Sequence, residues 1–342
     1  MIRIGINGFG RIGRVLTRII QSRNNLDVVA INDINPDINN IAYLYNYDTT
    51  YGKNDELVNV KEDIIFNTNL NIKIHHQKNL LDVPWDESGI DILIDSSGIS
   101  ENLKSYRNLS DTIDRVIITN SPDPKFIDNE MIYGVNHHNF DREKDFIISS
   151  SICDATAISP ILKCILEKYE IENGFLTTLH PWLGYQNLLD GPSKSYAVPG
   201  EIYDNYALGR SGPMTLIPKN TSAITATSKV VPEIRGKFIS NSFRVPTNIV
   251  SSADMTIKIK ENINLELIKE IFLSFSRKFA GIIDNNFDGL VSTDFIGNEY
   301  ASTIDHRFLK VQDNYIKLIC WYDNEWGYSS KVVDLINHIS NK

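Results

Sequence analysis

The sequence predicts an α/β domain built on a parallel sheet, followed by a second domain of the α+β class. The first 150 residues alternate short apolar runs with helical segments, and after them longer strand-like runs group around a few helices. The first pattern is typical of a parallel sheet covered on both faces, and the second is typical of an α+β arrangement. A length of 342 residues fits two domains.

The composition excludes several classes of protein. The chain carries 43 acidic and 34 basic side chains, with no cluster of Lys and Arg, so we expect no nucleic-acid partner. No apolar run approaches the roughly 18 residues of a membrane span, and the chain begins without a leader-like segment, so we expect no membrane and a cytoplasmic location. The three cysteines form no CxxC pair, which indicates neither a disulfide framework nor a bound metal.

The expected elements of the first half follow one another closely. Ile2, Ile4 and Ile6 alternate as in a strand, residues 11–22 have the pattern of a helix, and residues 27–31 form a compact β-branched run. Three more strand-like runs follow, at residues 91–96, 115–119 and 146–149.

The second half starts with a predicted helix over residues 153–169 and a strand over 174–180. Residues 190–218 are rich in Gly, Pro, Ser and Tyr and have no clear period, which is typical of a functional loop or a disordered one. This stretch contains Tyr196, Tyr203, Tyr206 and Arg210. We expect strands at 237–245, 249–260 and 315–322, and helices at 265–279 and 325–339.

A glycine-rich motif lies between the first strand and the first helix. Its residues are Gly8, Phe9, Gly10, Arg11, Ile12 and Gly13, a GxGxxG pattern that allows a backbone to approach a pyrophosphate. Alone, the motif could equally be a turn without a ligand. Asp33 ends the next strand 20 residues later, where a carboxylate would bind a ribose hydroxyl and repel a 2′-phosphate. The pattern therefore favours NAD over NADP, and the alternative for Asp33 is a turn or cap residue.

Two residues of the second half suggest nucleophilic chemistry. Cys153 stands at the expected start of a helix, where a thiol pKa is lowered, and His180 ends an apolar strand. From their surroundings alone, each is more often a buried structural residue.

Eight stretches spread over the chain carry a family resemblance. In order, they are INGFGRIGR, AIND, YDTTYGK, YGVNH, DGPSK, KVVPEIRGKF, FRVPT and WYDNEWGYS. Through them the chain resembles the glyceraldehyde-3-phosphate dehydrogenase family along essentially its whole length. The resemblance implies a Rossmann NAD-binding domain over residues 1–151, completed by a C-terminal helix at 324–342. It also implies a catalytic domain over 152–323 with a mixed or antiparallel sheet, and a homotetramer.

The resemblance also implies roles for single residues. Cys153 matches the nucleophile that forms a thiohemiacetal and then a thioester. His180 matches the histidine that helps ionise this cysteine and accepts the proton as the hydride leaves. The thioester would be released by inorganic phosphate or by water. Further cofactor contacts are implied for Ser97, Gly98, Thr119, Asn324 and Tyr328.

The departures from the family pattern gather around the substrate. Asp154 and Leu183 stand where the family has hydroxyl side chains, whereas Arg244 in FRVPT is kept. We therefore expect weaker binding of a phosphorylated triose and, since Asp154 is a like charge, a Cys153 pKa raised against the effect of the helix. The alternative for Asp154 is a carboxylate that stabilises the helix N-terminus. Further candidates for the substrate or phosphate site are Thr221, Ser222 and Arg210.

These features predict an NAD-dependent oxidation of a small sugar-derived aldehyde, with glyceraldehyde 3-phosphate as the best single substrate and inorganic phosphate as a further partner. One alternative is a divergent relative that oxidises a different aldehyde in a biosynthetic pathway. The other is a non-catalytic NAD-binding sensor or scaffold.

Overall fold

The computed structural model describes residues 1–195 and 197–342, so that Tyr196 of the predicted loop lies outside the described residues. The chain divides into two compact units. The first comprises residues 1–131, 139–151 and 332–342, and the second comprises 132–138 and 152–331. The boundary falls inside the C-terminal helix, of which the first unit takes residues 332–342 and not the whole of the predicted 324–342.

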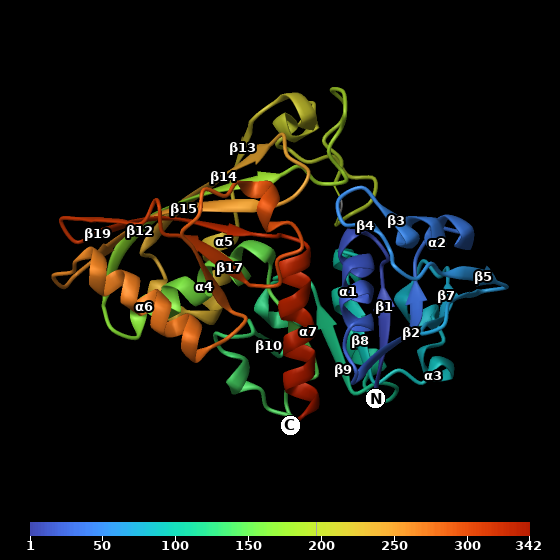
Figure 1. The fold of residues 1–342 in the computed structure, drawn as a ribbon. Coiled ribbons are helices and arrows are strands. Elements are labelled where there is room, and N and C mark those ends of the chain that lie inside the picture. The colour runs from blue at the N-terminus through green and yellow to red at the C-terminus, as the bar shows by residue number, and fades with distance from the viewer. Residues whose placement is uncertain (196) are drawn as a thin grey trace. The chain divides into compact units, whose positions relative to one another are not determined.

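The first unit contains a nine-stranded sheet with the order β10-β11-β9-β8-β1-β2-β7-β6-β5 (Figure 1). The strands from β10 to β7 are parallel, as predicted, whereas β5 and β6 add an antiparallel edge that the sequence did not indicate. The strands are β1 (Ile2–Asn7), β2 (Leu26–Asn32), β5 (Asn59–Lys61), β6 (Ile64–Phe66), β7 (Asn71–His75), β8 (Ile92–Asp95), β9 (Arg115–Ile118), β10 (Asn129–Glu130) and β11 (Ile147–Ser149), with a separate hairpin of β3 (Tyr47–Asp48) and β4 (Gly52–Lys53).

Three α-helices accompany this sheet: α1 (Arg11–Gln21), α2 (Ile38–Asn46) and α3 (Trp85–Ser88). Helix α1 is amphipathic, and its side chains Leu16, Ile19 and Ile20 are buried. Strand side chains such as Ile4 and Ile6 are fully buried, as expected for a sheet that is covered by other elements.

The second unit contains a mixed sheet with the order β13-β14-β12-β15-β19-β17-β16. Strand β12 runs parallel to β14 and antiparallel to β15, which confirms a mixed sheet in the second domain. The strands are β12 (Ile171–Pro181), β13 (Ile217–Lys219), β14 (Phe238–Val245), β15 (Ser251–Ile259), β16 (Ile283–Asn286), β17 (Ser302–Asp305), β18 (Lys310–Gln312) and β19 (Tyr315–Tyr322).

The core of the second unit lies on one side of this sheet. Its α-helices are α4 (Cys153–Leu166), α5 (Ala223–Val230) and α6 (Leu265–Lys278), together with the first residues of α7 (Trp326–Ser340), which belongs to the first unit from residue 332 on. Helices α4 and α6 lie on the same side of the strands (Figure 1). Along β12, Leu176, Thr178 and His180 are buried, whereas the alternate Phe175 and Leu179 are exposed. Burial therefore alternates from one residue to the next along β12. The buried side chains belong to the inner face of the sheet, which the helices cover, and the exposed ones belong to its open face.

The long predicted loop is partly ordered into short elements. It contains two 3-10 turns, at Tyr206–Gly209 and Gly212–Met214, and it ends in β13, where Ile217 is buried. No helix in the described residues combines the length and the apolar character needed to cross a bilayer.

Candidate active site

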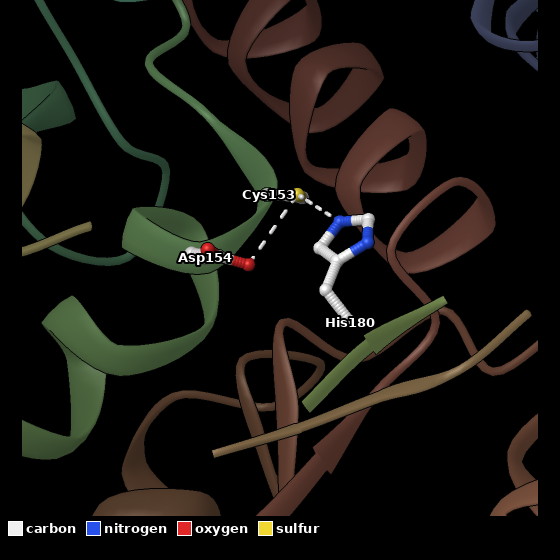
Figure 2. Close-up of side chains that lie close together, drawn as sticks. All are labelled: Cys153, Asp154 and His180. Carbon is white, nitrogen blue, oxygen red and sulfur yellow. Dashed lines mark hydrogen bonds between the residues drawn. The ribbon is translucent and has the colours of Figure 1, made fainter. Parts of the chain in front are cut away.

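Cys153 is the first residue of α4, and its side chain is only half-buried. Ser151, two residues before Cys153, takes a left-handed backbone conformation, with φ 62°. Figure 2 shows that the thiol faces two side chains, Asp154 and His180. The Cys153 Sγ atom lies 3.6 Å from His180 Nε2 and 3.7 Å from an Asp154 oxygen.

His180 is oriented by the backbone. Its Nδ1 atom lies 2.8 Å from the carbonyl oxygen of Pro181, which can only accept a hydrogen bond. The ring therefore carries its proton on Nδ1, and the lone pair of Nε2 faces the thiol. This is the tautomer that can take a proton from Cys153.

Burial keeps the pair uncharged. It lowers the pKa of His180 to about 4, with the positive charge of Arg244 as the next cause. Burial also raises the pKa of the Cys153 thiol well above its usual value, and the Asp154 carboxylate adds to that rise. The sequence suggested that Asp154 would raise the pKa of Cys153 and that the helix N-terminus would lower it. In the structure the pKa is raised, so the lowering by the helix N-terminus does not prevail.

Asp154 is buried and has a partner that the sequence did not indicate. The Tyr322 hydroxyl donates a hydrogen bond of 2.8 Å to the Asp154 oxygen that also faces the thiol. Burial, followed by the Asp154 charge, raises the pKa of Tyr322 well above its usual value, so that the phenol stays a donor. Tyr322 is the buried last residue of β19, and its contact with Asp154 joins two segments far apart in the sequence.

Two cations approach this cluster from neighbouring strands. In the sheet, Arg244 of β14 pairs with His180 of β12, and Lys219 of β13 pairs with Ser242, two residues before Arg244. The buried Arg244 Nη2 lies 3.5 Å from the Tyr185 hydroxyl, while its Nε has no hydrogen-bond partner among the described residues. Lys219 was missed as a site residue, because strand register is not readable from one sequence.

The other predicted substrate residues make local contacts. Arg210 forms a 2.7 Å ion pair with Asp190 on the surface. The Thr221 hydroxyl accepts a hydrogen bond from the Ala223 N–H at the start of α5, and Ser222 is the residue that precedes this helix. Leu183 is half-buried, and its N–H donates to Gln186.

The predicted cofactor residues of the first unit lie at the carboxyl ends of β1, β2, β8 and β9. Gly8 has φ +88°, and a Cβ on Gly13 would lie 2.2 Å from the Gly8 carbonyl oxygen, so both positions require glycine. The Phe9 N–H donates to Asp33 over 2.6 Å. Ser97, Gly98 and Thr119 follow β8 and β9. The carboxyl ends of parallel strands are where such sheets bind nucleotides.

Other members of the predicted set have different surroundings. Arg11 forms an ion pair with Asp48, and Ile12 is half-buried. In the second unit, Asn324 and Tyr328 are both buried, and the Asn324 Oδ1 has no hydrogen-bond partner among the described residues. An unpartnered buried amide oxygen fits a site for a ligand with an N–H donor, such as a carboxamide.

The side-chain donor atoms of Cys153, Asp154 and His180 lie within 4.8 Å of one another, close enough to hold a single divalent ion. Sulfur, oxygen and nitrogen donors together would suit zinc. The same three atoms are also the ones that nucleophilic chemistry at Cys153 would use, so an ion there would block it.

Comparisons with known proteins place these features in a family. A family model described as the NAD-binding domain of glyceraldehyde 3-phosphate dehydrogenase matches residues 2–103, and the C-terminal domain of the same family matches residues 152–324. The glyceraldehyde-3-phosphate dehydrogenase of Eremothecium gossypii is 35% identical over 99% of both chains. The cytosolic one of Sinapis alba is 35% identical over 99% of this chain and 98% of its own, and glyceraldehyde-3-phosphate dehydrogenase 1 of Kluyveromyces marxianus is 34% identical over 99% and 100%.

Proposed function

Because the chain belongs to the glyceraldehyde-3-phosphate dehydrogenase family, we propose that it oxidises glyceraldehyde 3-phosphate with NAD through a covalent intermediate on Cys153. The chain is an oxidoreductase of this type, with NAD as its cofactor. The observation that carries the proposal is the unprotonated Nε2 of His180, which faces the Cys153 thiol at 3.6 Å.

The reaction begins with a proton transfer. His180 Nε2 takes the proton of the Cys153 thiol while the sulfur bonds to the aldehyde carbon, and the proton passes on to the former carbonyl oxygen. The product is a neutral thiohemiacetal. Since both side chains are uncharged at rest, this transfer does not require a preformed ion pair.

Oxidation of the thiohemiacetal uses the same base. Bound NAD supplies the acceptor for the hydride that leaves the substrate carbon. His180 takes the hydroxyl proton at the same time, and the carbon–oxygen double bond of a thioester forms. An oxygen of inorganic phosphate then attacks the thioester, the carbon–sulfur bond breaks, and the thiolate recovers its proton from His180.

Several residues fit the cofactor. The positive φ of Gly8 and the close approach at Gly13 leave room for a pyrophosphate beside the backbone. Asp33 supports NAD over NADP, because its carboxylate would bind a ribose hydroxyl and repel a phosphate. The unpartnered oxygen of Asn324 would accept a hydrogen bond from the nicotinamide carboxamide.

The same proposal includes a homotetramer in the cytosol. The open face of the second sheet exposes Phe175, Leu179 and Ile239 by 53%, 41% and 71%, and Phe175 pairs with Ile239 on the neighbouring strand. An apolar patch on a sheet face supports burial against another copy of the chain. A cytosolic location is supported by the names of relatives from Sinapis alba and Arabidopsis thaliana.

The direct test is NADH formation from glyceraldehyde 3-phosphate and NAD, with and without inorganic phosphate. We expect phosphate-dependent turnover that is lost in Cys153→Ser. A protein that binds NAD and reacts rapidly with iodoacetamide at Cys153, yet does not oxidise this aldehyde, would contradict the proposed substrate.

A further inference from the structure

We propose that Lys219 is a further substrate-binding residue, whose ammonium group acts together with Arg244 to hold a phosphate group beside Cys153. The identity of the substrate in this inference rests on the proposed function. The binding of an anion by Lys219 and Arg244 is independent of the proposed function.

Strand register places Lys219 on the same face as the reactive residues. Lys219 pairs with Ser242, Arg244 pairs with Ile217, and His180 pairs with Arg244. Side chains two apart on a strand share one face, so Lys219, Ser242 and Arg244 all belong to the inner face that carries His180. Ser242, His180 and Arg244 are buried there, and Lys219 is half-buried.

Neither cation has a carboxylate partner among the described residues. The ion pairs found there include neither Lys219 nor Arg244, although surface lysines of the same unit, such as Lys258 and Lys260, are paired. Arg244 is only 7% exposed, and its Nε has no hydrogen-bond partner in the described part of the chain. A buried guanidinium with an unused donor is costly unless a ligand supplies the acceptor.

The electrostatic interactions of Lys219 support its proximity to this group. Burial and the charge of Arg244 lower the pKa of Lys219, and the charges of Asp154 and Cys153 oppose this lowering. Two cations with one carboxylate leave a net positive site, which favours an anion over a neutral aldehyde. The positive charge of Lys219 thus offsets the repulsion between Asp154 and a bound phosphate. Its ammonium group also replaces the hydroxyl donors that the family has at the positions of Asp154 and Leu183.

The ligand class is a phosphate oxyanion. It could be the phosphate ester of the substrate or the inorganic phosphate that attacks the thioester, since both present the same acceptor oxygens to Lys and Arg. The kinetic constants of Lys219 variants distinguish these two sources.

The first experiment compares Lys219→Met with Lys219→Arg and with Lys260→Met, a surface control that removes an equal charge from the same unit. In Lys219→Met we expect KM for glyceraldehyde 3-phosphate to rise about tenfold or more, and by a larger factor than KM for unphosphorylated glyceraldehyde. Lys219→Arg should recover most of the loss. A rise in KM for inorganic phosphate instead would assign Lys219 to the attacking phosphate.

A second experiment needs no turnover. Inorganic phosphate should protect Cys153 from iodoacetamide, and the concentration giving half-protection should rise about tenfold or more in Lys219→Met but not in Lys260→Met. If the wild type shows this protection but does not oxidise glyceraldehyde 3-phosphate, the anion site stands and the proposed substrate is wrong. If the wild type turns over and Lys219→Met matches it in both KM values and in protection, the inference is overturned and the function stands.

Discussion

The Asp154 carboxylate next to Cys153 opposes ionisation of the thiol. It lies 3.7 Å from the Cys153 sulfur, and after burial it is the largest cause of the raised thiol pKa. The sequence also suggested a simple helix-stabilising role for Asp154, and its position in the first turn of α4 is compatible with both effects.

Asp154→Asn should make Cys153 more reactive. The variant removes the negative charge but keeps an oxygen that accepts from Tyr322, so the fold is retained. We expect the pH midpoint of iodoacetamide alkylation to fall by about one unit or more. Glu167→Gln, which removes a charge at the opposite end of α4, is the control and should leave the midpoint in place. An equal midpoint in Asp154→Asn and the wild type would contradict this role of Asp154.

His180 should make the protein less stable in acid. Its pKa is lowered from 6.5 to about 4 in the folded chain, so the unfolded chain binds a proton first as the pH falls. Above pH 6.5 the titration of this group therefore does not change the free energy of unfolding. As the pH falls from 6.5 to about 4, the neutral state of His180 makes the free energy of unfolding fall by about 3 kcal/mol.

Urea unfolding at pH 7.5 and at pH 4.5 measures this loss. The free energy of unfolding of His180→Gln should fall less between the two pH values than that of the wild type. The exposed His76→Gln serves as the control and should behave as the wild type does. Equal losses in His180→Gln and the wild type would show that His180 is not held in its neutral form.

At the residue scale, the family resemblance singled out Cys153 and His180 in the sequence, and the structure brings their side chains to 3.6 Å from one another. Lys219 and Tyr322 were not predicted as site residues. Their closeness to Cys153 depends on the pairing of β13 with β14 and on the contact of β19 with α4. Such contacts join residues far apart in the sequence, and a single sequence contains no direct signal of strand register.

At the scale of elements, a hydrogen bond connects the start of α4 with the end of β19. The Tyr322 hydroxyl donates it to Asp154, and both side chains are buried. This hydrogen bond holds the helix turn that begins with Cys153, so Tyr322 acts on Cys153 through Asp154.

Tyr322→Phe should weaken this connection. Because the acceptor is a buried carboxylate, the loss should lower the free energy of unfolding by about 1.5–3 kcal/mol. Tyr315→Phe, at the partly exposed beginning of the same strand, is the matched control and should change it little. Chemical denaturation of the three proteins measures the difference. A variant as stable as the control would show that the hydrogen bond contributes nothing net.

Element prediction succeeded where the hydrophobic period was strong. The helix that starts at Arg11 and the helix that starts at Cys153 both begin where the sequence placed them. The antiparallel edge of β5 and β6 was missed because these strands have three residues each, within a polar stretch, and are too short for a period to emerge.

At the scale of the whole molecule, the open face of the second sheet is the surface proposed to meet another copy. Phe175→Asp places a charge at the centre of its apolar pair with Ile239 and should dissociate the homotetramer. Leu267→Asp, an equally drastic change at an exposed position of α6, should not. Light scattering coupled to gel filtration gives the mass. An unchanged mass in Phe175→Asp would exclude this face from the interface.

The central claim is that Cys153 carries the substrate as a thioester. The most direct measurement mixes the protein with NAD and glyceraldehyde 3-phosphate without inorganic phosphate, stops the reaction rapidly and locates any acyl group by peptide mass spectrometry. We predict one acyl group per chain on the Cys153 peptide, formed together with one equivalent of NADH. NADH production without an adduct on Cys153, or undiminished in Cys153→Ser, would contradict the account.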